Sequence, residues 1–150
     1  MCALTESFPS LKDSILLIRM DASGNIEWTR SLEGEDVSQP ETMIASSDGG
    51  FLVVGYANNH VTDNSDIEVI KFDGAGGIEW VGLYGGASTE YAYGVAHSAD
   101  GGYLVTGSTN SYRDTTRRSI FVMKLSPTGE LLWLKLIGGL SGNSAGYSVA

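Results

Sequence analysis

Three versions of one phrase, each closed by a tryptophan, decide the fold of this chain: SILLIRMDASGNIEW at 14–28, DIEVIKFDGAGGIEW at 66–80 and SIFVMKLSPTGELLW at 119–133. Trp28, Trp80 and Trp133 are therefore 52 and 53 residues apart. A second phrase follows the first two tryptophans, as SSDGGFLVVGY at 46–56 and SADGGYLVTGS at 98–108. A fixed period of this length indicates a repeat architecture, in which each repeat is one supersecondary unit.

Each period contains four short runs that are rich in Ile, Val, Leu, Tyr and Trp and bounded by Gly, Asp, Asn and Ser, which predicts four β-strands. No window shows a capped helix with an apolar stripe, so the chain is predicted to be all-β. Ordered by their place in the repeat, the predicted strands are 42–45, 92–97 and 147–150; 51–55 and 103–107; 15–20, 67–72 and 120–125; and 26–29, 78–81 and 131–136.

Tight turns are predicted between consecutive strands of a repeat. The first strand is joined to the second by Asp48-Gly49-Gly50 and by Asp100-Gly101-Gly102, because Gly supplies the positive φ that a tight hairpin needs. Segments 21–24, 73–76 and 126–129 join the third strand to the fourth. They open with Asp or Ser and close with Gly, which is a type I turn pattern.

Four antiparallel strands in a repeat of about 50 residues are typical of a β-propeller blade. We expect a lead-in over 1–13, full repeats over 14–65 and 66–118, and a partial repeat over 119–150. Because a ring needs about four to eight blades, the chain is interpreted as a partial β-propeller and a fragment of a larger ring. A ring assembled from several chains and an open stack of sheets stay open as alternatives. Closure needs further blades of the same or another chain.

Two sets of repeated side chains are expected to be structural. The three tryptophans occupy one place in the fourth strand, so we expect them to pack between neighbouring blades. Lys71 and Lys124, with Arg19 at the same place, are expected to face a repeated acidic or carbonyl partner.

The second repeat carries a pattern that resembles the bacterial and archaeal β-propeller repeat proteins. Its matching residues are Asp66, Lys71, Asp73, Gly76, Trp80, Gly85, Gly86, Glu90, the run DGGY at 100–103, Gly107 and Thr109. The first repeat departs from the pattern, with Glu33-Gly34 in place of Gly-Gly and with Val54 and Ala57 in place of the threonines. The resemblance implies the propeller fold and a family whose members are often secreted or attached to the cell surface. The phrase at 21–28 is also distantly similar to quinoprotein propeller repeats, but nothing maps onto a quinone site, so no cofactor is predicted.

The overall charge excludes several classes of partner. The chain has 18 acidic and 9 basic residues and a formal charge of −9, which disfavours nucleic acid because phosphate binding depends on Lys and Arg. No apolar run approaches the roughly 20 residues of a membrane-spanning helix, so no membrane insertion is expected. Cys2 is the one cysteine, so neither an internal disulfide nor a cysteine metal site is predicted. The N-terminal residues do not resemble a signal peptide, and the compartment is left open.

The longer connections are the predicted place of binding. They span 33–41, 57–65, 85–90, 109–119 and 138–144, and the alternation of antiparallel strands places them on one face. Variable loops on a rigid scaffold are where binding residues usually lie. Aromatic rings beside a carboxylate suit a sugar or peptide, and a cluster of arginines suits an acidic partner. The candidate binding residues are Glu90, Tyr91, Tyr93, Tyr112, Arg113, Arg117 and Arg118.

Three apparent catalytic or metal motifs are interpreted as incidental. The run GNSAG at 142–146 matches a hydrolase elbow, but that motif needs a strand, a turn and a following helix. His60 and His97 occupy different repeat positions and have no metal-ligand spacing. The run DNSD at 63–66 lacks the Gly and distal Glu of a calcium loop. No catalytic or metal site is therefore predicted. We expect a non-catalytic scaffold that binds protein or glycan. The alternative is a fragment of a propeller enzyme, quinoprotein-like or glycan-active, whose catalytic residues lie in other blades.

Overall fold

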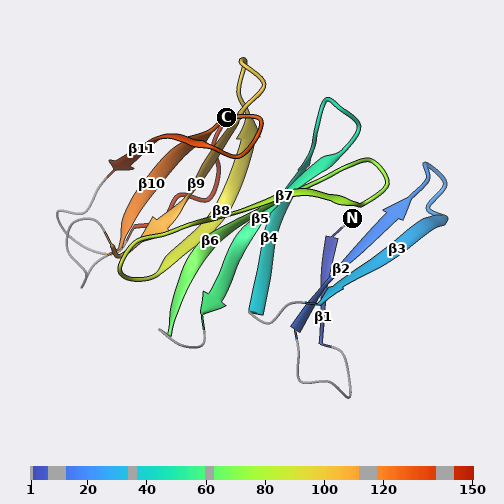
Figure 1. Ribbon diagram of the computed structural model, residues 1–150, viewed down its shortest axis with the longest axis horizontal. Coiled ribbons are helices and arrows are strands. Elements are labelled where there is room, and N and C mark those ends of the chain that lie inside the picture. Colours follow the sequence, from blue (N-terminus) through green and yellow to red (C-terminus); the bar gives the residue numbers. More distant parts are fainter. Residues whose placement is uncertain (1, 7–12, 34–36, 60–62, 112–117, 138–143) are drawn as a thin grey trace.

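The protein folds into three antiparallel β-sheets arranged side by side, as a computed structural model shows (Figure 1). The structure describes residues 2–6, 13–33, 37–59, 63–111, 118–137 and 144–150. The first sheet contains β1 (Cys2–Glu6), β2 (Asp13–Met20) and β3 (Ile26–Glu33). The middle sheet contains β4 (Val37–Ala45), β5 (Phe51–Asn59), β6 (Asn64–Phe72) and β7 (Ile78–Tyr84). The last sheet contains β8 (Glu90–His97), β9 (Tyr103–Thr109), β10 (Ser119–Leu125) and β11 (Leu131–Ile137).

The all-β prediction is confirmed, since the described residues contain strands and turns and no helix. One predicted strand was wrong: the residues at 147–150 form no strand. They follow the last sheet, and none of the described strands pairs with them, so their sequence preference finds no ladder. With no helix present, none of the described elements is a candidate for a membrane-spanning helix.

The middle and last sheets repeat one strand register. Each contains four strands in chain order, paired as hairpins. A β-bulge in the first strand falls at Glu41 in β4 and at Tyr93 in β8, 52 residues later. Opposite each bulge is a glycine, Gly55 and Gly107, where a side chain would collide with the backbone of the bulged strand. The bulge and its glycine are therefore one device used twice.

The hydrophobic core lies between the sheets. One buried cluster joins Leu52, Ile67 and Val69 of the middle sheet to residues of the last sheet such as Val105 and Phe121. A second cluster joins the first sheet to the middle sheet and contains Ile15, Leu17, Val53, Ile70 and Phe72. The two β6 sets alternate along the strand, so the middle sheet buries both of its faces.

The tryptophans occupy different surroundings. Trp28 of β3 faces Phe51 of β5, with ring centroids 6.4 Å apart. Trp80 of β7 faces Tyr103 of β9, with centroids 6.5 Å apart. Trp133 of β11 is 40% exposed, because no described sheet follows β11. Two of the three rings thus lie between neighbouring sheets.

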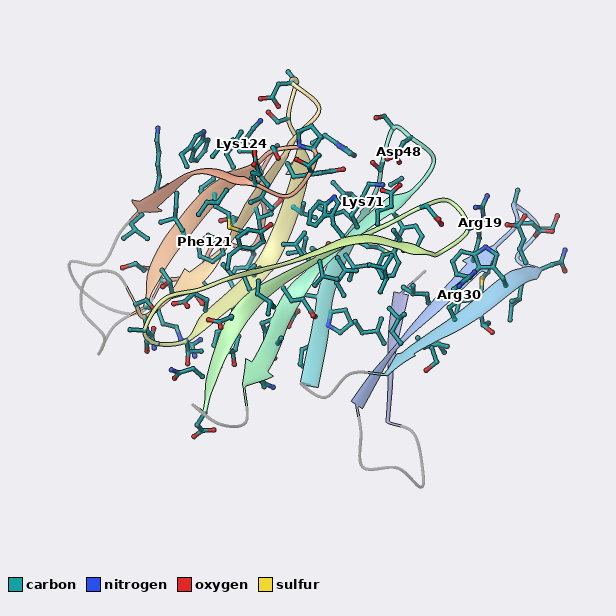
Figure 2. The ribbon with its side chains drawn as sticks, viewed as in Figure 1. Arg19, Arg30, Asp48, Lys71, Phe121 and Lys124 are labelled. Carbon is teal, nitrogen blue, oxygen red and sulfur yellow. The ribbon has the colours of Figure 1, made fainter. Side chains whose placement is uncertain are left out.

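Buried lysines tie strands to tight turns. Lys71 is 2% exposed, and its Nζ lies 2.7 Å from both Asp48 and Glu79 (Figure 2). Lys124 pairs with Asp100 at 2.6 Å in the same way. The hydrogen bond from the lysine, together with a backbone hydrogen bond within the turn, lowers the pKa of each aspartate to about 2. The acidic partner expected for these lysines is therefore the first residue of the turn.

The tight turns set the direction of the other connections. At 46–50, Gly49 has a φ of 86° and Gly50 donates its N–H to Asp48. Because turns at 46–50 and 73–77 close one end of the middle sheet, the β5–β6 and β7–β8 connections leave from the opposite end.

Candidate functional site

A row of tyrosine rings lies at the end of the sheets from which the longer connections leave. Tyr56 meets Tyr91 edge to face, with ring centroids 4.6 Å apart. Tyr91 stacks on Tyr93 at 6.3 Å, and Tyr93 stacks on Tyr147 at 5.2 Å. Tyr56, Tyr91, Tyr93 and Tyr147 are called the tyrosine row below. Tyr147 is 73% exposed, and the other three rings are half-buried.

Three separate segments build the tyrosine row. Tyr56 lies near the end of β5, and Tyr91 and Tyr93 lie at the start of β8. Tyr147 belongs to the C-terminal segment 144–150, which is held by backbone hydrogen bonds from Ser144 to Arg118 and from Gly146 to Gly107, each 3.1 Å long. The row is therefore assembled by tertiary packing and is not a local sequence motif.

Charged groups lie beside the rings. The guanidinium carbon of Arg118 lies 4.9 Å from the centroid of Tyr91, within the range of a cation–π contact. Burial, followed by the charge of Glu41, raises the pKa of Tyr56. Glu41 is exposed and is the bulged residue of β4, just as Tyr93 is the bulged residue of β8. The surface thus combines flat aromatic faces with one positive and one negative side chain.

Glu90 lies beneath this surface and not on it. It is 1% exposed. Its Oε1 accepts hydrogen bonds from the hydroxyls of Thr109 at 2.7 Å and Ser111 at 2.5 Å. Its Oε2 accepts the N–H of Gly86 at 2.8 Å. The carboxylate therefore joins the β7–β8 connection to the end of β9. We assign Glu90 to this structural network, although the sequence predicted it as a ligand contact.

A second carboxylate, Asp66, lies close to Glu90. Both approach Gly85, where a side chain would collide with Asp66. Burial, followed by the charge of Glu90, raises the pKa of Asp66. A cavity of about 210 Å³ beside them is lined by residues such as Ile67, Tyr84 and Glu90.

The structure tests the placement of the remaining candidates only in part. Tyr112, Arg113 and Arg117 lie outside the described residues. His97 contacts the carbonyl oxygen of Ala45 at 2.6 Å, at the far end of β8 from the tyrosine row. No helix follows Ser144 at 144–150. Within the described part of the chain, no three His, Cys, Asp or Glu side chains gather as metal ligands.

Sequence reasoning named Tyr91, Tyr93 and Arg118 but missed Tyr56, Tyr147 and Glu41. Two of these could have been found from the repeat period. Tyr147 is 54 residues after Tyr93, and Glu41 is 52 residues before it. Only Tyr56, which comes from the second strand, needed the tertiary structure.

Comparison with known proteins adds no family. A scan against models of protein families and a search of curated proteins both found no match to this chain.

Proposed function

We propose that the three sheets are neighbouring blades of an incomplete β-propeller and that the chain is a non-catalytic binding scaffold. The repeated four-strand register and the repeated tryptophan contacts between sheets support the blade interpretation. The tyrosine row supports the binding role and is the observation that carries this proposal.

The chemistry of the tyrosine row suits a glycan or a peptide segment. Tyrosine offers a large, rigid and amphipathic contact at low entropic cost, which is why it is enriched in binding surfaces. The exposed ring of Tyr147 continues the stack begun by Tyr93. Arg118 and Glu41 at its border add the polar contacts that give orientation and selectivity. A ligand with a flat apolar face and polar edges fits this combination.

Array binding tests the proposal. The chain is screened against immobilised neutral and acidic oligosaccharides and against a library of short peptides. Tyr93→Ala and Tyr147→Ala are expected to weaken every specific signal at least tenfold, since truncating a central aromatic contact costs about 2 kcal/mol or more. Val81→Ala, at a position that is 52% exposed and outside the row, is the control and is expected to bind as the wild type does. Equal binding by all variants would overturn the proposal.

A second candidate is a fragment of a propeller enzyme, and Asp66 is the observation that favours it. A carboxyl group with a raised pKa beside a second carboxylate and a cavity is a plausible general acid. Glu90, however, already accepts three hydrogen bonds from the protein. Hydrolysis of labelled oligosaccharides by the wild type that is lost in Asp66→Asn would favour this enzyme; turnover unaffected by Asp66→Asn, or none, would exclude Asp66 as its acid.

A further inference from the structure

The same contact joins each sheet to the next. A Cβ atom added to Gly76, in the turn between β6 and β7, would lie 2.9 Å from the ring of Trp28. A Cβ atom added to Gly129, in the turn between β10 and β11, would lie 2.9 Å from the ring of Trp80. Each tryptophan therefore covers the turn glycine of the following sheet, and both glycines have a positive φ. The contact has a donor half, the tryptophan, and an acceptor half, the turn glycine.

One donor and one acceptor are left without a partner at the two ends of the stack. Trp133 is the equivalent donor on β11 and is 40% exposed. Gly24 is the equivalent acceptor, in the turn between β2 and β3, with a φ of 84°. A Cβ atom at Gly24 would meet nothing within 4 Å. The two ends of this chain are thus the complementary halves of a contact that it already makes twice.

Charge makes the two ends more specific for each other. Two residues after Trp28, Arg30 also lies over the turn glycine, with its Cδ 3.0 Å from the Cβ position at Gly76 (Figure 2). That turn opens with Asp73, whose pKa is lowered by the backbone hydrogen bond from Gly77 and, more weakly, by the charge of Arg30.

The other internal contact lacks both charges. Its turn opens with Ser126, and Gly82 occupies the place of Arg30; the hydroxyl of Tyr84 donates instead to Gly129 O at 2.5 Å. At the ends of the chain the charged pair returns. Lys135 follows Trp133 by two residues, and the acceptor turn opens with Asp21.

Backbone topology agrees with this pairing. The first sheet has the order β1–β2–β3, so β1 occupies the place of a second strand and has an unpaired edge among the described strands. The C-terminal segment 144–150 lies where a first strand would follow the last sheet, with Tyr147 stacked on Tyr93. Placed against β1 of another copy, it would complete a four-stranded sheet.

We propose that the chain associates head to tail with a second copy of itself, with Trp133 and Lys135 of one copy seated on the turn of Gly24 and Asp21 of the other. Two copies related by a two-fold axis satisfy both ends at once, which makes the dimer the smallest closed assembly. The inference rests on the contact between sheets and is independent of any ligand of the tyrosine row.

Analytical ultracentrifugation of the full chain, from about 1 to 200 μM, tests this association. The wild type is expected to reach twice the 15.9 kDa chain mass. Trp133→Glu removes the donor, and Gly24→Asn fills the acceptor with a residue that tolerates positive φ; each is expected to stay monomeric. Leu83→Glu, at a position that is 60% exposed on the middle sheet, is the control and is expected to dimerise. Lys135→Glu is a milder variant that preserves the ring of Trp133, and it is expected to weaken dimerisation about tenfold.

Mixing the two monomeric variants decides between head-to-tail and symmetric contacts. A copy with Trp133→Glu retains a working acceptor, and a copy with Gly24→Asn retains a working donor. Native mass spectrometry with one variant labelled with ¹⁵N is expected to show a mixed dimer through the single intact contact. A wild type that remains monomeric at 200 μM, or two folded variants that fail to combine while the wild type dimerises, would overturn the proposal.

Discussion

Replacing Glu90 by alanine is expected to destabilise the protein by about 3–4 kcal/mol. The carboxylate accepts three hydrogen bonds, from Gly86, Thr109 and Ser111, at 2.5–2.8 Å. Hydrogen bonds to a charged group contribute about 1.5–3 kcal/mol each, so the gross loss is about 5–9 kcal/mol. Roughly half of it is recovered, because the exposed N–H of Gly86 can bind water and an ordered glutamate gains rotamer entropy when it is released.

Urea unfolding followed by tryptophan fluorescence measures this free energy. The midpoint is expected to fall sharply in Glu90→Ala, with an unchanged slope, because the surface exposed on unfolding is similar. Glu90→Gln keeps the size and one acceptor oxygen, so about half of the loss is expected. Glu130→Ala is the matched control at an exposed position and is expected to change stability by less than about 0.5 kcal/mol. A loss below about 1 kcal/mol in Glu90→Ala would refute the reasoning, since a buried carboxylate with three donors would then be dispensable.

Three further predictions concern the scaffold. Trp80→Ala is expected to lower the free energy of unfolding by about 3 kcal/mol, clearly more than Trp133→Ala at a monomeric concentration, and urea titration of both variants compares them. Asp48 and Asp100 have pKa values of about 2 in the folded protein against an ordinary value of 3.8, so their stabilisation is complete above about pH 4 and is lost as the pH falls towards 2; urea midpoints at pH 5 and 2.5 should differ less in Asp48→Asn than in the wild type. Gly107→Ala is expected to reduce the yield of folded protein, because its Cβ would collide with the backbone of the β8 bulge, and circular dichroism with thermal melting checks it.

The sequence predicted the strands well because each lies in a repeat that states the same pattern two or three times. Period-2 alternation, turn glycines and the opening aspartates of the turns are all local signals. The segment 147–150 shows the limit of such signals. Its sequence matches the start of β8, but a strand needs a partner, and partners are set by the tertiary structure.

The candidate site was predictable only where the period carried it. Tyr91 and Tyr93 were named from their place at the start of a strand. Whether they face a ligand depends on Tyr56 and Tyr147, which reach them from other segments. The misassignment of Glu90 has the same origin. A carboxylate next to tyrosines reads as a surface group, and only the positions of Thr109 and Ser111 show that it is buried.

Tyrosine ring resonances during ligand binding test the central claim, that the tyrosine row binds a glycan or peptide, most directly. The chain is labelled with ¹³C in its tyrosine rings and titrated with the strongest binder from the oligosaccharide and peptide arrays. We predict that the signals of Tyr91, Tyr93 and Tyr147 shift in a saturable manner while those of Tyr84 and Tyr103, which lie outside the row, stay in place. The absence of any binder, or shifts confined to Tyr84 and Tyr103, would contradict the account.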